Sequence, residues 1–438
     1  MKVTFSNLKE FTRGHISAGN TREAVRGGIA LMKADPLDME VRFIITDLLI
    51  SLREKEKLAM FLQASFETAR VSGHGACAFS FAGMLRDIGF DVSDMLSLLA
   101  DTYSSSSNII SDSGSRVAPL EDSTPVDAPE SYQNSDDELI LSIVSMGSDK
   151  SKLTDLPARL LPMPLLSELD RESFLTIIRD FKILRLKESD PVIREGEPGD
   201  SFYICALGDL NVFKSDTYGR KTTLATLHGG AIFGEMALVQ RAPRSASVNA
   251  GSFAEVLEFS ARNLSDMASQ LPVVAQALDK FTRDRLIGNL MNNSPFFKPF
   301  SRKQRKELLK HFQAYVVETD TVVVREGDEG AGLYIVLGGE IDIFKDYKMP
   351  DEVRLATLGS TESFGEISLI NDSPTSASCV AARRSTLLFL ARHYFSRLLS
   401  SVPELNEYFK LLSENRLHQT RDILAEIQSE EEEEFILI

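Results

Sequence analysis

The chain has few of the residues that build disulfide frameworks and metal centres. Among its 438 residues there are three cysteines, six histidines and no tryptophan. Because Cys77, Cys205 and Cys379 are odd in number and scattered, we expect no disulfides and a reducing, cytoplasmic location. The histidines have no metal-ligand spacing, so no metal is expected; they are His15, His74, His228, His311, His393 and His418.

Catalytic motifs are missing as well. The sequence contains no Walker loop, nucleophile elbow, protein-kinase signature or paired-carboxylate motif. A metal-dependent jelly-roll enzyme would need a His-x-His pair followed by a glutamate, which is also absent. We therefore predict no catalytic residues and a protein that is not an enzyme.

Positive charge and long apolar runs are scarce. The chain has 48 Lys and Arg against 64 Asp and Glu, a net charge of −16 and a pI near 5.0. This balance argues against a partner that is nucleic acid or an anionic membrane surface. The most apolar stretch, residues 43–52, is short and contains Asp47, so no membrane span or signal peptide is predicted.

An internal repeat is the clearest feature that is present. Short sequences recur 131 positions later: Arg194-Glu195-Gly196 as Arg325-Glu326-Gly327, Leu224-Ala225-Thr226-Leu227 as Leu355-Ala356-Thr357-Leu358, and Phe233-Gly234-Glu235 as Phe364-Gly365-Glu366. Both copies alternate short apolar runs with Gly and Asp turns, which is typical of antiparallel strands. The repeat predicts two jelly-roll barrels in tandem.

The stretch 233–248 has the chemistry of a site for a ribose cyclic phosphate. Gly234 permits a sharp turn, and residues 236–238 can begin a short helix whose free N–H groups face an anion. The Glu235 carboxylate can accept hydrogen bonds from a ribose hydroxyl. Arg244, nine positions further on, can donate a planar fork of hydrogen bonds to phosphate oxygens.

This stretch resembles the phosphate-binding cassette of the cyclic-nucleotide-binding domain family, in which Phe-Gly-Glu and a short helix precede Pro-Arg-x-Ala. The family includes regulatory subunits of cAMP-dependent kinase, bacterial catabolite activators and cyclic-nucleotide-gated channels. The resemblance implies a ligand site made of Phe233, Gly234, Glu235, Met236, Ala237, Arg244, Ser245 and Ala246. It implies cAMP as the ligand, with cGMP as the alternative, because the Ser245 hydroxyl could contact either the phosphate or the base.

The second copy departs from the family pattern, since Thr375 stands where the first copy has Arg244. Without a guanidinium, a phosphate would be held only by backbone N–H groups and hydroxyls. We therefore predict a second site that is degenerate or has a different ligand. It would consist of Gly365, Glu366, Ile367, Ser368, Thr375, Ser376 and Ala377.

Residues 1–102 have apolar residues at helical spacing, interrupted near residues 19–20, 35–36, 72–75 and 89–91. The pattern predicts paired helices. Ala24 and Pro36 weakly resemble conserved positions of tetratricopeptide repeats, which would make this region a docking module for a protein partner; a generic helical bundle is the alternative. For either kind of helical region, oligomerisation or capping is the alternative function, and the oligomeric state stays open.

The remaining segments complete the predicted domain organisation. Residues 103–150, rich in Ser, Asp, Pro and Glu, are predicted to be a disordered linker without the Arg-Arg pair of a kinase pseudosubstrate. The two barrel domains are expected at 163–290 and 294–428, with a connecting helix over 273–291. Residues 429–438 read as a frayed acidic tail, or as a short apolar peptide that a partner captures.

The predicted fold class is thus α+β multidomain, with an all-α module followed by two antiparallel barrels and their flanking helices. A transcription factor would need a basic helix-turn-helix after a barrel, which this acidic C-terminal region lacks. We predict a cyclic-nucleotide receptor that converts ligand binding in the first barrel into a domain rearrangement read by a partner protein. The alternative is a scaffold that does not sense nucleotides.

Overall fold

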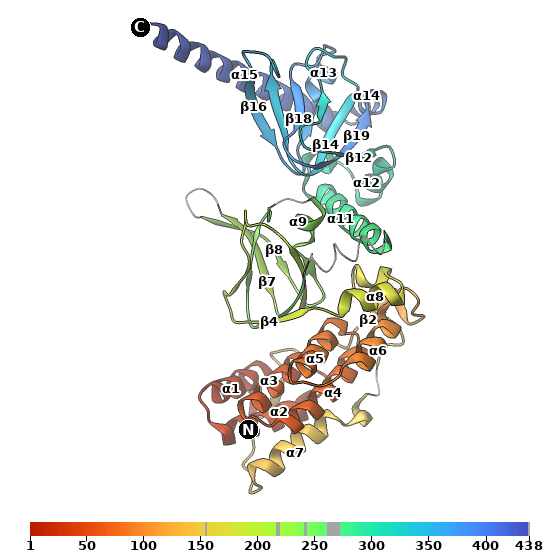
Figure 1. Cartoon of the computed structure of the whole chain (residues 1–438), viewed down its shortest axis with the longest axis vertical. Helices are drawn as coiled ribbons and strands as arrows, with labels where there is room; N and C mark the ends of the chain where they lie inside the picture. Colours follow the sequence, from red (N-terminus) through yellow and green to blue (C-terminus); the bar gives the residue numbers. More distant parts are fainter. Residues whose placement is uncertain (154–155, 216–219, 241–242, 261–271, 437–438) are drawn as a thin grey trace. The chain divides into compact units, whose positions relative to one another are not determined.

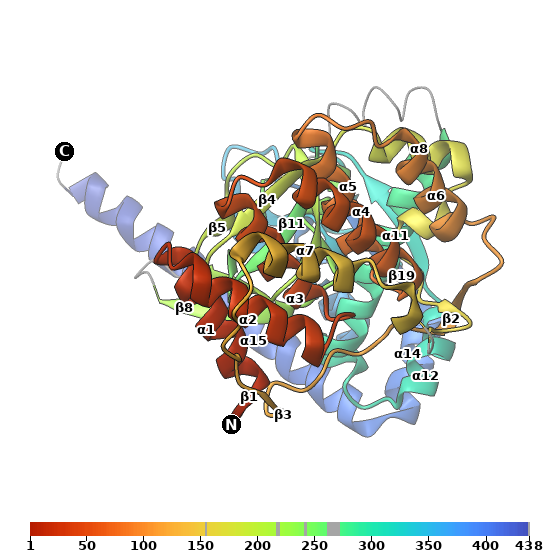
Figure 2. The same cartoon turned by 90° about the horizontal axis from the view of Figure 1, so that it is seen from below.

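The computed structural model describes residues 1–153, 156–215, 220–240, 243–260 and 272–436 (Figures 1 and 2). The chain divides into two units. The first is built from Met1–Leu238 and Pro243–Asp279, and the second mainly from Lys280–Ile438. The predicted fold class is confirmed: a helical region precedes two barrels of antiparallel strands.

The N-terminal region consists of helices whose boundaries include the four predicted breaks and a further break at residues 52–54 that was not predicted. They are α1 (Phe5–Ser17), α2 (Thr21–Ala34), α3 (Met39–Ser51), α4 (Lys55–Val71), α5 (Gly75–Asp87) and α6 (Ser93–Tyr103). Asp38 caps α3 because its carboxylate accepts hydrogen bonds from the N–H groups of Glu40 and Val41. Consecutive helices pack as hairpins, α1 on α2 and α4 on α5. The tetratricopeptide resemblance of this region stays a prediction.

Residues 103–150 were predicted to be a disordered linker, and this prediction was wrong because parts of the segment form strands and a helix. The segment contains β2 (Ile110–Ser115), β3 (Pro125–Asp127) and α7 (Asp136–Gly147), followed by the 3-10 turn η1 (Lys150–Lys152). β3 pairs with β1 (Lys2–Thr4). Helix α7 begins in a capping box and packs against α2 and α4, as Figure 2 shows; its buried residues are Leu139, Ile140, Ile143 and Val144. The acidic, Ser-rich composition around this apolar run concealed it.

Arginine side chains tie the rest of this segment down. Arg22 of α2 donates hydrogen bonds to the carbonyls of Tyr132 and Asn134, at 2.5 and 2.7 Å. Arg26, one turn later, donates to the carbonyls of Glu130 and Pro129. The backbone carbonyls of residues 129–134 thus accept hydrogen bonds from arginines of α2. These bonds order a stretch that forms neither helix nor strand.

The first barrel forms between residues 182 and 260. Its strands are β4 (Lys182–Leu186), β5 (Pro191–Ile193), β6 (Ser201–Leu207), β7 (Leu210–Ser215), β8 (Lys221–Leu227), β9 (Ile232–Phe233), β10 (Ser247–Ala250) and β11 (Ala254–Ser260). One antiparallel sheet has the order β5-β10-β7-β8 and the other β4-β11-β6-β9. Its helices are the turn η2 (Leu166–Glu168), α8 (Arg171–Ile178) and α9 (Glu235–Gln240). The predicted connecting helix is α11 (Pro272–Asn293).

The second barrel repeats this topology strand for strand. Its strands are β12 (Gln313–Val317), β13 (Val322–Val324), β14 (Gly332–Gly338), β15 (Ile341–Lys345), β16 (Val353–Leu358), β17 (Ser363–Phe364), β18 (Ser378–Ala381) and β19 (Ser385–Ala391). They form sheets of order β13-β18-β15-β16 and β12-β19-β14-β17. Its helices are η3 (Pro295–Phe297), α12 (Arg302–Leu309), α13 (Glu366–Ile370), α14 (Arg392–Ser401) and α15 (Pro403–Ile436). The predicted frayed tail is therefore helical as far as Ile436, and residues 437–438 lie outside the described part.

The helical region and the first barrel share one apolar interface. Helix α5 packs against β4, β6 and β11. The Phe79 ring lies 6.1 Å from Phe174 and 5.8 Å from Phe181. Two hydrogen bonds to backbone carbonyls close the interface: Cys77 Sγ donates to Ala206 over 3.1 Å, and Arg86 to Phe181 over 2.8 Å. The helical region is thus fixed to the first barrel by aromatic packing.

An ion network with one buried member, Glu255, also crosses this interface. The Arg185 guanidinium on β4 donates to Glu255 of β11 at 2.5 Å and to Asp47 of α3 at 2.7 Å. Glu255 is fully buried, and burial raises the pKa of its carboxyl to about 7, although Arg185 opposes that shift. Burial also raises the pKa of Asp47.

This network predicts a pH dependence of stability. Because the folded protein binds the Glu255 proton more tightly than the unfolded chain, this group's contribution to the free energy of unfolding falls as pH rises from 4.5 to about 7. We expect the advantage of the wild type over Glu255→Gln to shrink by about 1–3 kcal/mol between about pH 5 and about pH 8. Urea unfolding at both pH values measures this. Glu188→Gln, at an exposed position, serves as the control, and an advantage that stays constant with pH would contradict the prediction.

Candidate ligand-binding sites

The first cassette begins where β9 ends at a glycine turn. Gly234 has φ +81°, in the left-handed region that favours glycine. A Cβ at this position would lie 2.8 Å from Arg244 Nη1 and 3.0 Å from the Tyr203 ring. Tyr203 in turn stacks on Phe233, with ring centroids 5.2 Å apart. The turn therefore leaves room for a guanidinium directly beside the backbone.

Arg244 occupies that space. Its side chain is buried, lies 5.5 Å above the Tyr203 ring centroid, and donates from Nη1 to the Gly234 carbonyl over 2.6 Å. Its backbone is held by Gly196 N–H to Arg244 carbonyl and by Arg244 N–H to Glu197 carbonyl, at 2.9 and 2.8 Å. Within the described ranges no carboxylate forms an ion pair with Arg244. A buried guanidinium that contacts a neutral carbonyl has the charge to bind an anion.

The other predicted residues of the first site lie around this guanidinium. Phe233, Glu235 and Ala237 are buried, whereas Met236 and Ala246 are half-buried and Ser245 is exposed. Gly199 and Tyr203 also belong to this site, although neither was predicted to. A Cβ at Gly199 would lie 2.9 Å from the Arg244 guanidinium and 2.5 Å from Ala237, and the Tyr203 ring lies under Arg244. The repeat carried a signal for both, because Gly199 and Tyr203 recur as Gly330 and Tyr334.

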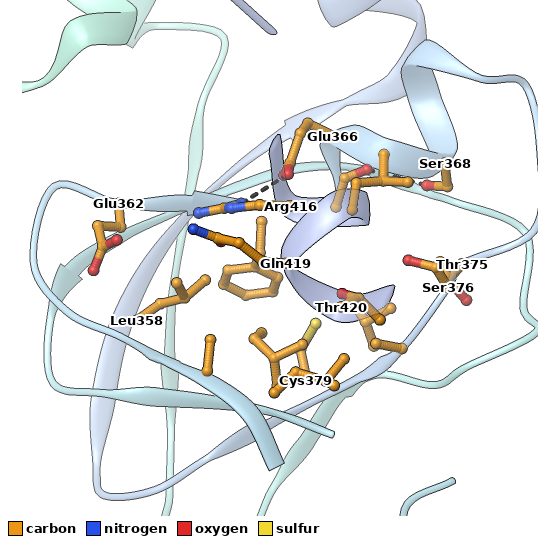
Figure 3. A pocket seen from close by; sticks show the side chains of 18 of the residues that line it. Leu358, Glu362, Glu366, Ser368, Thr375, Ser376, Cys379, Arg416, Gln419 and Thr420 are labelled. Carbon is orange, nitrogen blue, oxygen red and sulfur yellow. Dashed lines mark hydrogen bonds and ion pairs between the residues drawn. The ribbon is translucent and has the colours of Figure 1, made fainter. Parts of the chain in front are cut away.

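All seven predicted residues of the second site line one cavity of about 260 Å³ (Figure 3). Its apolar lining comes from strands β13, β15, β16, β17 and β18 and includes Val324, Ile343, Leu355, Leu358, Phe364 and Cys379. Helix α15 supplies the remaining wall with Arg416, Gln419, Thr420 and Ile423. Sequence reasoning missed this contribution of α15.

Thr375 takes the place of Arg244 in an unchanged backbone frame. Gly327 N–H donates to its carbonyl and its N–H donates to the Asp328 carbonyl, both over 2.9 Å. Its hydroxyl donates to the Arg325 carbonyl over 2.5 Å. The hydroxyl is thus engaged by backbone, and no cationic side chain stands at this position.

Arg416 contacts the second cassette from a different element. Its Nη1 donates to Glu366 Oε1 over 2.7 Å and to the Ser363 carbonyl over 2.6 Å, and Figure 3 shows the ion pair. The repeat could have indicated this residue, since the spacing of 131 continues from Arg285 to Arg416 and from Pro272 to Pro403. It was missed because the contact joins residues 50 positions apart.

In the part of the chain that the structure describes, no three His, Cys, Asp or Glu side chains are grouped as metal ligands would be. Among the described helices, none combines the length and the apolar character that a bilayer crossing requires.

Comparison with known proteins tests the resemblance directly. The family model described as "Cyclic nucleotide-binding domain" matches residues 183–270 and 316–402. The cAMP-dependent protein kinase regulatory subunit of Pyricularia oryzae is 28% identical over 257 residues, which are 54% of this chain and 60% of that protein. That of Schizosaccharomyces pombe is 28% identical over 254 residues, 55% and 58% of the respective chains. The chain thus spans about 60% of the length of such relatives.

Among solved structures, the regulatory domain of Toxoplasma gondii PKA with cAMP is 25% identical and covers 57% of this chain and 92% of that one. Its TM-score is 0.28, which is too low to support a similarity between the two whole structures. The family match stands without it, because both matched ranges fall on the two barrels. The chain contains two cyclic nucleotide-binding domains in tandem, related to those of cAMP-dependent protein kinase regulatory subunits.

Proposed function

We propose that this protein is a receptor for a cyclic nucleotide, cAMP rather than cGMP, which binds in the first barrel. The observation that carries the proposal is the buried Arg244 guanidinium beside the Gly234 turn, for which no carboxylate partner stands within the described residues. The names of the two relatives described above, both cAMP-dependent protein kinase regulatory subunits, support cAMP. The protein would act by binding and not as an enzyme.

The proposed binding mode follows from the chemistry of the cassette. Arg244 would donate to the exocyclic phosphate oxygens, and the first N–H groups of α9 would face the same charge. The buried Glu235 carboxylate would accept a hydrogen bond from the ribose 2′-hydroxyl. A low dielectric around both groups strengthens these interactions relative to water.

We further propose that a protein partner reads the ligand state. Helix α11 is the covalent link between the two units, beginning in the first and continuing into the second. A ligand that binds one arrangement of the units better than another would shift their equilibrium. The three cysteines are free and buried, which supports a reducing, cytoplasmic setting.

A kinase as that partner has less support from this chain. The segment 103–150 contains a single arginine, Arg116, whose side chain donates to the Gly229 carbonyl of the first barrel over 3.2 Å. A pseudosubstrate would need basic residues free to enter a kinase cleft. The names of the relatives support a protein partner as such.

Removing the guanidinium tests the site. We expect Arg244→Ala to weaken cAMP binding by about 30-fold to a few thousand-fold, roughly 2–5 kcal/mol, because a desolvated phosphate charge loses its partner. Titration calorimetry of the full chain measures the Kd. Arg194→Ala, an exposed arginine of the same barrel, should bind like the wild type. Equal affinity in Arg244→Ala and the wild type would show that the site is elsewhere.

The role of Glu235 predicts sugar selectivity. In the wild type cAMP should bind about tenfold or more tightly than 2′-deoxy-cAMP, because the deoxy sugar cannot form the hydrogen bond from the 2′-hydroxyl to the buried carboxylate. Glu235→Ala should reduce this preference several-fold. Competition titrations with both nucleotides give the ratio, and Glu197→Ala, an exposed glutamate near the cassette, is the control. A ratio that Glu235→Ala leaves unchanged would refute the assignment.

Hydrogen exchange distinguishes the hypothesis of a nucleotide receptor from that of a scaffold that does not sense nucleotides. Saturating cAMP should slow exchange in residues 233–247 and change it in α11, and should do neither in Arg244→Ala. Mass spectrometry of the full chain resolves both regions. Protection confined to the cassette, with α11 and the second barrel unaltered, would favour a structural ligand on a scaffold that does not sense nucleotides.

A further inference from the structure

The cavity of the second barrel has an acidic lining. Its charged lining residues among those described are two carboxylates, Glu362 and Glu366, and one guanidinium, Arg416. Arg416 is already paired with Glu366 at 2.7 Å. The remaining formal charge is negative, which disfavours an anionic ligand in a partly enclosed cavity.

The part of the cavity that corresponds to the phosphate site offers little to an anion. Thr375 directs its hydroxyl hydrogen to the Arg325 carbonyl, and Ser368 donates its own to the Gly365 carbonyl over 3.0 Å. Helix α13, which begins here, has only five residues. A cyclic phosphate would thus exchange its water for a neutral surface that offers no cation, at a net cost.

Arg416 cannot easily replace the missing cation. Glu366 is 1% exposed, so turning Arg416 toward a phosphate would leave that carboxylate buried without a counter-ion. The second Arg416 bond, to the Ser363 carbonyl over 2.6 Å, would break in the same movement. The guanidinium therefore neutralises Glu366 and orients it.

Glu366 also presents an unused acceptor. Its Oε1 accepts from Arg416, while its Oε2 is buried and has no hydrogen-bond partner among the described residues. A carboxylate oxygen only accepts, so it requires a donor from a ligand. A sugar hydroxyl is such a donor, whereas an ionised phosphate oxygen is not.

The rest of the cavity suits a flat, weakly polar group. Val324, Ile343 and Leu358 line one side, and Ile423 of α15 lines another. In Figure 3 the Gln419 amide lies toward Arg416, and both Gln419 and Thr420 line the cavity. An amide and a hydroxyl can hydrogen-bond the edge of a heterocyclic base.

We propose that the second barrel binds an uncharged nucleoside, not a cyclic nucleotide. The ribose hydroxyls donate to Glu366, the base lies between the apolar wall and α15, and the 5′-hydroxyl faces Thr375 and Ser376. This proposal does not depend on the identity of the first barrel's ligand, since it rests on residues of the second unit alone.

The experiment uses the full-length Arg244→Ala chain, in which the first site is silenced. Adenosine, guanosine, cytidine and uridine are titrated by calorimetry, each beside its 3′,5′-cyclic monophosphate. We expect one nucleoside to bind once per chain, about tenfold or more tightly than its cyclic monophosphate. The wild-type chain should bind this nucleoside with the same affinity.

Variants of the second cavity locate the binding. Glu366→Gln should weaken the nucleoside about tenfold or more, because an amide is a poorer acceptor for the hydroxyls. Thr420→Trp, on the helix surface that lines the cavity, should abolish binding by filling the space. Glu235→Gln, the equivalent change in the first barrel, should leave nucleoside affinity unaltered. Thr375→Arg should reverse the preference in favour of the cyclic monophosphate.

Several outcomes would overturn the proposal. One is that none of the four nucleosides binds, and another is that binding is unaffected by both Glu366→Gln and Thr420→Trp. A cyclic monophosphate that binds the second barrel more tightly than its nucleoside would also overturn it. None of these results bears on the first barrel, whose ligand is tested by cAMP affinity in the wild type against Arg244→Ala.

Discussion

Both ligand sites depend on one backbone frame that ties the cassette to the turn before it. In the first barrel the Gly196 N–H donates to the Arg244 carbonyl and the Arg244 N–H donates to the Glu197 carbonyl; in the second, the equivalent turn bonds in the same way to Thr375. These bonds use only main-chain atoms. They therefore fix the backbone at this position in the same way for an arginine and for a threonine. One substitution can therefore change the charge of a site without changing its fold.

The two barrels carry the same buried acid but differ in the residue that follows it nine positions later, Arg244 in the first and Thr375 in the second. Glu235 and Glu366 are each 1% exposed, and a buried carboxylate is costly unless a positive charge or hydrogen-bond donors accompany it. The first barrel holds its guanidinium in the cassette itself, at Arg244. The second receives Arg416 from α15, directly onto Glu366. A cation at the cassette position would meet a ligand's phosphate, whereas Thr375 leaves that position neutral.

Sequence reasoning predicted what is local or repeated. The strands follow from short-range alternation and turns, the cassette from one contiguous motif, and the missing charge at Thr375 from aligning two copies of that motif. It missed α7, because an apolar run of four buried residues was hidden in a low-complexity segment. It also missed Arg416 and the packing of Phe79 on Phe181, because such contacts join residues far apart in sequence and are fixed only by the tertiary fold.

Strand β6 connects the candidate site of the first barrel with helix α5 of the helical region. Tyr203 of this strand lies beneath Arg244 and stacks on Phe233, so its position is set by the ligand-binding turn. Three residues later the carbonyl of Ala206 accepts from Cys77 of α5, inside the interface with the helical region. A close-packed strand moves as a body, so a displacement at Tyr203 would reach α5 without passing through α11. The helical region thus packs on the strand that carries Tyr203, and a partner bound to that region would lie close to the candidate site of the first barrel.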